Sequence, residues 1–161
     1  MNEIPDLLVR YLRGPDLVAA AMTGATDLEL DFKPAPNKWS VRQIVAHLAD
    51  TEAIAVTRLR GVIAEDNPAL VPFDQDAWAE KTNYSKRKPA RDLETIRRLR
   101  ADNYELLKEL PEEAFSRTGR HARRGTMTLL DLLRLFAEHA EKHAVQIHGV
   151  LSEYKTSQAA R

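Results

Sequence analysis

The sequence predicts an all-α protein, a four-helix bundle in which a long crossover joins the second and third helices. Apolar residues recur at helical spacing in four long segments, and the glycines and prolines interrupt these segments instead of marking regularly spaced strand turns. Between the second and third segments, residues 65–89 are long enough to cross a bundle from end to end. We assign residues 1–155 to this single domain and residues 156–161 to a C-terminal tail.

The first helix is predicted from about Pro5 to Met22. Gly14 and Pro15 are expected to kink or interrupt it, because proline lacks a backbone donor and its ring crowds the preceding turn. The proline-containing stretch of residues 25–38 is predicted to be a loop.

The second helix is predicted to begin after Ser40 and to extend to about Ala64. Ser40, followed three residues later by Gln43, forms a capping-box pattern. In this pattern the side chain of each residue accepts a hydrogen bond from the backbone N–H of the other. In the crossover, residues 74–81 are expected to form a short helix.

The third and fourth helices follow the crossover. The third is predicted over residues 90–110, and residues 111–126 are predicted to be a loop or short turn. Thr128 and Asp131 resemble another capped helix start, and the apolar stripe of the last helix continues to Leu151. The tail is expected to be frayed.

The composition limits the classes of protein to which the chain can belong. Its 161 residues include 24 basic and 24 acidic side chains, which indicates one neutral domain without the strongly basic surface of many nucleic-acid-binding proteins. Because there is no cysteine, any metal must be held by His, Asp or Glu. No apolar stretch reaches the roughly 18 residues that span a bilayer, and the N-terminus lacks a secretory pattern. We therefore expect a cytoplasmic protein that makes no membrane contact.

Three of the five histidines have the spacing of metal ligands. His139 and His143 are four residues apart, so both lie on one face of the last helix, one turn from each other. His47 lies at the edge of the apolar stripe of the second helix. Metal sites of bundles are built between facing helices, and a three-histidine set would leave coordination positions open. The alternative is that these are ordinary interior histidines, each hydrogen-bonded to a neighbour.

Two segments carry a family resemblance. Residues 37–52 (NKWSVRQIVAHLADTE) and residues 139–147 (HAEKHAVQI) resemble the DinB/YfiT-like family of metal-binding four-helix bundles. Further matches are Gly14-Pro15, the segment of residues 73–78 and the segment of residues 121–128, so the resemblance covers nearly the whole chain.

The resemblance implies a divalent metal, nickel or zinc, held by His47, His139 and His143 with open coordination positions. It also implies an enzyme that transfers a low-molecular-weight thiol, such as bacillithiol or mycothiol, to an electrophilic substrate. A metal-dependent hydrolase is one alternative, and a non-catalytic metal-binding or structural dimer is another. Members of one family share fold and site more often than chemistry.

Several neighbours of the histidines are candidates for catalysis or for lining a pocket. Asp50, one turn after His47, could orient that ring, Arg58 could pair with a substrate carboxylate, and His121 matches a family position. For Asp50 and Arg58 the alternative is an ion pair within the bundle; for His121 it is an exposed loop residue. Thr51 and Gln146 are expected to lie near the site, although Gln146 could equally make a structural contact.

The expected partners are a small-molecule substrate and a second copy of the chain. Basic residues are frequent in residues 86–100, and a second group of basic residues follows after the third helix. The basic residues of the third helix are spread over several faces that also carry acids, which is typical of a solvated surface, so we expect no nucleic-acid binding. Among the second group, Arg120, Arg123 or Arg124 could attract an anionic thiol cosubstrate.

Overall fold

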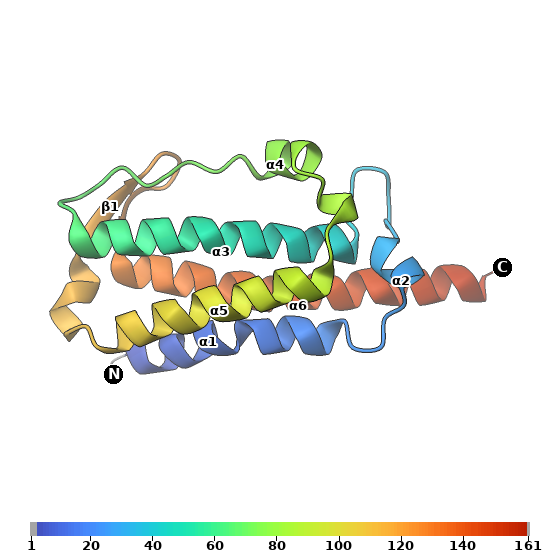
Figure 1. The fold of residues 1–161 in the computed structure, drawn as a ribbon, viewed down its shortest axis with the longest axis horizontal. Helices are drawn as coiled ribbons and strands as arrows, with labels where there is room; N and C mark the ends of the chain where they lie inside the picture. The colour runs from blue at the N-terminus through green and yellow to red at the C-terminus, as the bar shows by residue number, and fades with distance from the viewer. Residues whose placement is uncertain (1–2, 161) are drawn as a thin grey trace.

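A computed structural model describes residues 3–160 and shows a bundle of four long helices (Figure 1). These helices are α1 (Ile4–Ala21), α3 (Val41–Ala64), α5 (Pro89–Lys108) and α6 (Leu129–Ala159). The predicted all-α, four-helix architecture is confirmed. None of the helices within the described range is both long and apolar enough to cross a membrane.

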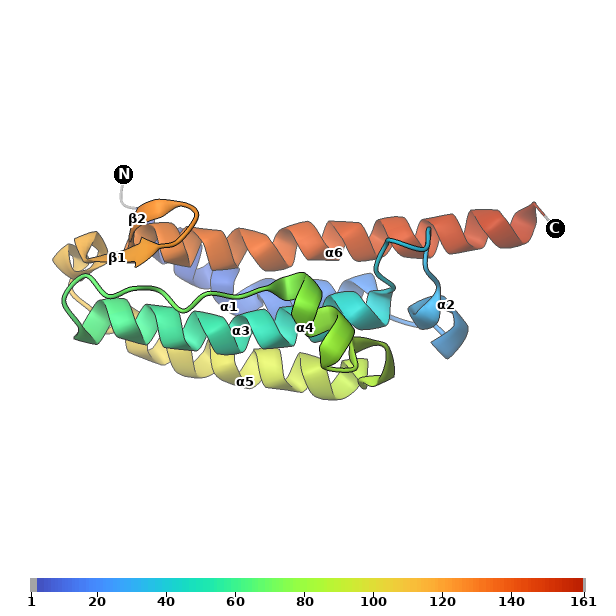
Figure 2. The ribbon, with the colours of Figure 1, turned by 90° about the horizontal axis from the view of Figure 1, so that it is seen from above.

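The crossover sets the direction of the third bundle helix. In Figures 1 and 2, α1 and α6 run the same way and lie side by side, whereas α3 and α5 run the opposite way and also lie side by side. After α3, residues 65–74 return along the bundle to α4 (Gln75–Lys81) and the short turn η1 (Tyr84–Lys86). Without this return, α5 could not start at the same end as α3.

The predicted helix starts are confirmed by their capping contacts. The Ser40 hydroxyl accepts from the backbone N–H of Gln43, whose side chain accepts in turn from the N–H of Ser40. Thr128 and Asp131 make the same reciprocal pair at α6. In α1 the helix continues through Pro15 without a break.

Two stretches predicted as loops contain regular structure. Within residues 25–38, α2 (Asp27–Asp31) begins with a capping box of Thr26 and Glu29. Within residues 111–126 the chain forms the turn η2 (Glu112–Ser116) and most of a hairpin of β1 (Thr118–His121) and β2 (Gly125–Thr128). These elements are too short to show periodicity; only the Thr-x-x-Glu pattern gave a local signal for α2. The last helix also extends to Ala159, which places residues 156–159 of the proposed tail in α6.

The hairpin holds the crossover against the bundle. The backbone N–H of Leu70 donates to the carbonyl of Arg120 at 2.9 Å, and the N–H of Arg120 donates to that of Pro68 at 2.8 Å. Gly119 permits this close approach, because a Cβ there would lie 2.7 Å from the Leu70 side chain and 2.8 Å from that of Val62. The pairing fixes where residues 71–74 pass over α3.

The core consists of two apolar clusters with a polar layer between them. One cluster lies toward the hairpin and includes Leu59, Leu107 and Leu133; the other lies toward α2 and includes Ile44 and Ile147. The polar layer is formed by the buried side chains of Tyr11, Glu52, Arg100 and Asn103. On α1, α3 and α5, which carry these residues, the change from one cluster to the other falls close to them.

Candidate metal centre

The structure brings His47, His139 and His143 together between α3 and α6. The Nε2 atom of His139 lies 3.1 Å from Nε2 of His47 and 3.0 Å from Nε2 of His143. The ligand atoms of the three rings all lie within 4.8 Å of one another, and within residues 3–160 no carboxylate belongs to this group. Three ring nitrogens therefore converge on one point.

Burial keeps the three rings in the form that binds metals. Desolvation, reinforced by the neighbouring His143, lowers the pKa of His47 to about 3. The pKa of His139 is lowered to about 2, first by burial and then by the other two histidines. Burial also lowers the pKa of His143. At neutral pH the rings are neutral and each has one nitrogen lone pair for an ion.

Gln146 sets the tautomer of His143. Its Oε1 atom lies 2.7 Å from Nδ1 of His143, and since a carbonyl oxygen accepts, the ring carries its proton on Nδ1. The Nε2 lone pair of His143 then faces the other two histidines. Metal-binding histidines commonly have such a partner on the second nitrogen. The structure thus places Gln146 beside the histidine cluster.

The spacing of the nitrogens fits a small divalent ion. Imidazole nitrogens bind zinc at about 2.0–2.1 Å, so two such ligands at a tetrahedral angle are about 3.3 Å apart. The observed separations of 3.0 and 3.1 Å are close to this value. A neutral histidine ring has only one N–H donor. Without an ion, three ring nitrogens that point at one another therefore cannot all be satisfied by hydrogen bonds. The donor set thus fits a metal better than an ordinary polar cluster.

Aromatic side chains hold the His47 ring in place. The ring of Phe73 stacks on it at a centroid distance of 6.0 Å and an interplanar angle of 9°, and Trp39 lies at 4.9 Å. Phe73 comes from the crossover, which the hairpin holds over α3, and Trp78 of α4 packs edge-on against Phe73 at 4.8 Å. The position of Phe73 beside His47 could not be predicted from the sequence, because a crossover residue has no helical periodicity to locate it.

The polar residues after His47 on α3 have different surroundings. The Thr51 hydroxyl lies 3.5 Å from both ring nitrogens of His47, so Thr51 contacts the site as expected. Asp50 instead accepts a hydrogen bond from Arg87 at 2.6 Å. This is the ion pair that was the alternative to orienting His47.

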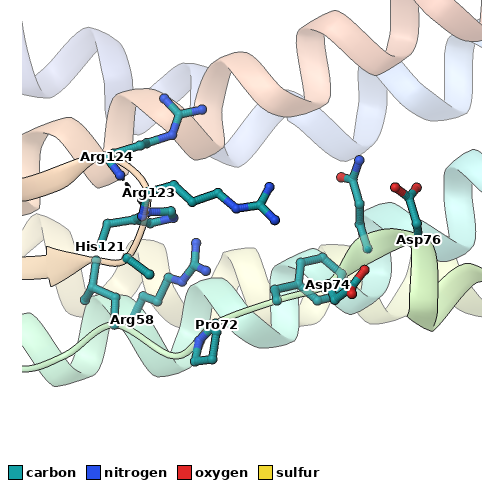
Figure 3. Close-up of a pocket in the computed structure, with 11 residues that line it drawn as sticks. Arg58, Pro72, Asp74, Asp76, His121, Arg123 and Arg124 are labelled. Carbon is teal, nitrogen blue, oxygen red and sulfur yellow. Dashed lines mark hydrogen bonds between the residues drawn. The ribbon is translucent and has the colours of Figure 1, made fainter.

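Arg58 and His121 lie together in a neighbouring pocket of about 410 Å³ (Figure 3). Its walls come from α3, the crossover, the start of α4 and the hairpin. Arg58 donates from Nε and Nη2 to the carbonyl of Val71, at 3.1 and 2.7 Å, and is not in an ion pair of the described chain. Arg58 therefore does not form the ion pair within the bundle that was the alternative to pairing with a substrate carboxylate, because its hydrogen-bond acceptor is a backbone carbonyl. His121 belongs to this pocket and not to the histidine cluster.

Comparisons with known proteins agree with this fold. The family sequence model of the DinB superfamily matches residues 10–147 of this chain. A protein from Oceanobacillus iheyensis, provisionally named a metal-dependent hydrolase, is 30% identical over 91% of this chain and 81% of its own length. YfiT from Bacillus subtilis, provisionally named in the same way, is 30% identical over 83% of this chain and 75% of its own length. The solved structure of YfiT, described as having an unusual four-helix bundle topology, matches with a TM-score of 0.89 and 26% identity over 94% of this chain and 87% of that one. From the fold, the converging histidines and these matches together, we conclude that the chain belongs to the DinB superfamily.

Proposed function

We propose that the protein is a metal-dependent enzyme that acts on a small molecule, with a divalent ion held by His47, His139 and His143. The observation that carries this proposal is the convergence of three neutral ring nitrogens, with Nε2 of His139 at 3.1 and 3.0 Å from those of His47 and His143 and all three within 4.8 Å of one another. The provisional names of the relatives from Oceanobacillus iheyensis and Bacillus subtilis support it. The ion we propose is nickel or zinc, since both accept imidazole ligands.

The three neutral imidazoles would leave the full charge of a bound dication in place, and such an ion lowers the pKa of a water or thiol beside it. Other residues of this chain would hold the histidine rings in the orientation that binds the ion. Gln146 keeps the proton of His143 on Nδ1, and Phe73 and Trp39 fix the plane of the His47 ring.

Hydrolysis is the reaction that the relatives' names favour. An ester or amide bond would be cleaved by water, and the substrate would be oriented by the pocket that adjoins Phe73. This reaction requires no cosubstrate.

Thiol transfer is the second candidate, and one structural observation favours it. A water nucleophile is often assisted by a carboxylate base, but Asp50 is paired with Arg87 and Glu52 with Arg100. A thiol acidified by a bound ion needs no such base, because its pKa is already near 8.5 in water. The chain has no cysteine, so the thiol would come from a low-molecular-weight cosubstrate.

Turnover measurements test the proposal and separate its two forms. Tag-free protein is loaded with zinc or nickel and assayed on a panel of esters and amides, and then on electrophiles with an added low-molecular-weight thiol. We expect turnover on one panel, its loss in His139→Ala, and normal activity in His148→Ala, which changes an exposed histidine of the same helix. Equal rates for wild type and His139→Ala would contradict the proposal.

A further inference from the structure

We propose that the pocket between the hairpin and the crossover binds an oxyanion group, a carboxylate or phosphate, of the small-molecule substrate. Arg58 and His121 are the residues that would contact it, and Arg124 would attract it. The identification of the bound anion as part of the substrate depends on the proposed function; the anion site itself does not.

Arg58 is a buried cation without a counter-charge. Its side chain belongs to the buried part of α3, with 9% of the residue exposed. No acid of residues 3–160 forms an ion pair with it, whereas the other buried arginine, Arg100, is bound to Glu52. Burial and the charge of Arg124 both lower the pKa of Arg58, which means that its charge is poorly solvated. A desolvated charge of this kind is stabilised when an anion binds to it.

The orientation of Arg58 is fixed before any ligand arrives. Its Nε and Nη2 atoms donate to the Val71 carbonyl, and Val71 belongs to the crossover segment that pairs with the hairpin. Figure 3 shows the guanidinium directed into the pocket near Pro72 and Arg123. The remaining N–H groups of the guanidinium can therefore donate to a ligand without the reorganisation that a free surface arginine requires.

His121 supplies a second donor. Its Nδ1 atom accepts from the backbone N–H groups of Arg123 and Arg124, at 3.1 and 3.2 Å, so the neutral ring carries its proton on Nε2. His121 lines the same pocket as Arg58. The hairpin turn thus holds an N–H donor at the cationic end of the pocket.

The charges of the pocket are unevenly distributed. Figure 3 shows Arg58, His121 and Arg124 at the hairpin end, and Asp74 and Asp76 at the end formed by α4. Asp74 is committed to the start of α4, where it accepts from the N–H of Ala77 at 3.0 Å. An anion is therefore attracted to the hairpin end and repelled from the other.

The pocket is connected to the histidine cluster through Phe73, which lines the pocket and stacks on His47. Arg58 and His47 are three turns apart on α3, about 16 Å along the helix axis. A substrate bound by its anionic end at Arg58 would have to be extended to present its reacting group at the histidines. The pocket volume of about 410 Å³ is sufficient for such a molecule.

Calorimetric titration with malonate and with inorganic phosphate tests the anion site. The full chain is stripped of metal and freed from chelator, so that neither anion can bind to an ion at the histidines. We expect saturable binding that is weakened at least tenfold in Arg58→Gln and several-fold in Arg124→Gln. Neutral malonamide should not bind. Preference for malonate would identify a carboxylate site, and preference for phosphate a phosphate site.

Two control variants separate this proposal from others. Arg98→Gln removes one charge from an exposed position of α5 outside the pocket, and His143→Ala removes a proposed metal ligand; both should bind the anions like wild type. Unchanged binding in Arg58→Gln would overturn the proposal. If that variant does not fold, the exposed Arg124→Gln decides, and unchanged binding there would overturn it equally. Anion binding without turnover by the metal-loaded protein would refute only the proposed function.

Discussion

The Glu52 carboxylate accepts a hydrogen bond from Nε of Arg100 at 2.8 Å, and the two side chains are 2% and 1% exposed. Arg100 also donates to the backbone carbonyls of Tyr11 and Phe136, at 2.7 and 2.8 Å. One side chain of α5 is thereby linked to α1, α3 and α6 in the middle of the bundle. Phe136 lies three residues before His139, so this link also fixes α6 close to the histidine cluster.

Replacing Arg100 by methionine should strongly destabilise the fold. The substitution leaves the Glu52 carboxylate buried without a cation, and breaking a buried pair in this way costs about 3–5 kcal/mol. Denaturant unfolding measures the loss. Arg97→Met, at an exposed position of the same helix, is the control and should change the free energy of unfolding by no more than about 0.5 kcal/mol. Equal stability of the two variants would contradict this role of Arg100.

The same arginine explains why residue 14 is glycine. A Cβ at Gly14 would collide with the guanidinium of Arg100 and lie 2.8 Å from the Cβ of Ala140. Gly14→Ala should therefore lower the free energy of unfolding by about 1–3 kcal/mol. Gly149→Ala, in open space on α6, should be neutral or stabilising by up to about 1 kcal/mol. A Gly14→Ala protein as stable as Gly149→Ala would contradict the close approach.

These contacts show what the sequence predicts and what it does not. The helices were predictable because their apolar residues follow the helical period and because Ser40 and Thr128 are capping residues. The Glu52–Arg100 pair was not, because nothing local to either residue identifies a partner 48 positions away. The family resemblance included Gly14, but the reason for a glycine at this position becomes clear only when α5 is packed beside α1.

Gln146→Leu should weaken metal binding without unfolding the protein. Loss of the contact with Nδ1 of His143 frees the ring to take the other tautomer, and such losses reduce metal affinity by about 10–100-fold. Competition with a chromophoric chelator measures the affinity for zinc. Val145→Leu, at an exposed neighbouring position, should bind zinc like wild type. If both variants bind zinc equally well, Gln146 does not support the site.

Asp131 should contribute to stability only where it is ionised. The backbone N–H of Thr128, its hydroxyl and Arg134 lower the pKa of Asp131 in the folded protein. The contribution is therefore present above the pKa of the unfolded chain, near 3.9, and is lost as the pH falls through the lower folded value. Because the carboxylate is partly exposed, solvent limits the effect to at most about 1 kcal/mol.

Unfolding curves of wild type and Asp131→Asn at different pH values check this contribution. The isosteric variant should be less stable than wild type at pH 7, and the gap should narrow below pH 3. A gap of the same size at both pH values would show that the charge of Asp131 does not stabilise the start of α6.

The candidate site was predictable in its histidines and not in its surroundings. His139 and His143 share a helix face because of their spacing, and His47 lies on the inner side of its helix. Placing the three together required the packing of α3 against α6. Phe73 belongs to the crossover, and the pocket beside it depends on the pairing of the crossover with β1, which no local pattern indicates.

The metal content of tag-free protein tests whether His47, His139 and His143 form a metal site. Wild type, His143→Ala and the control His148→Ala are equilibrated with zinc or nickel, freed from excess metal and analysed for bound ions. We expect about one ion per chain in wild type and His148→Ala, and none in His143→Ala. A wild type that retains no ion, or a His143→Ala protein that retains as much as wild type, would contradict this expectation.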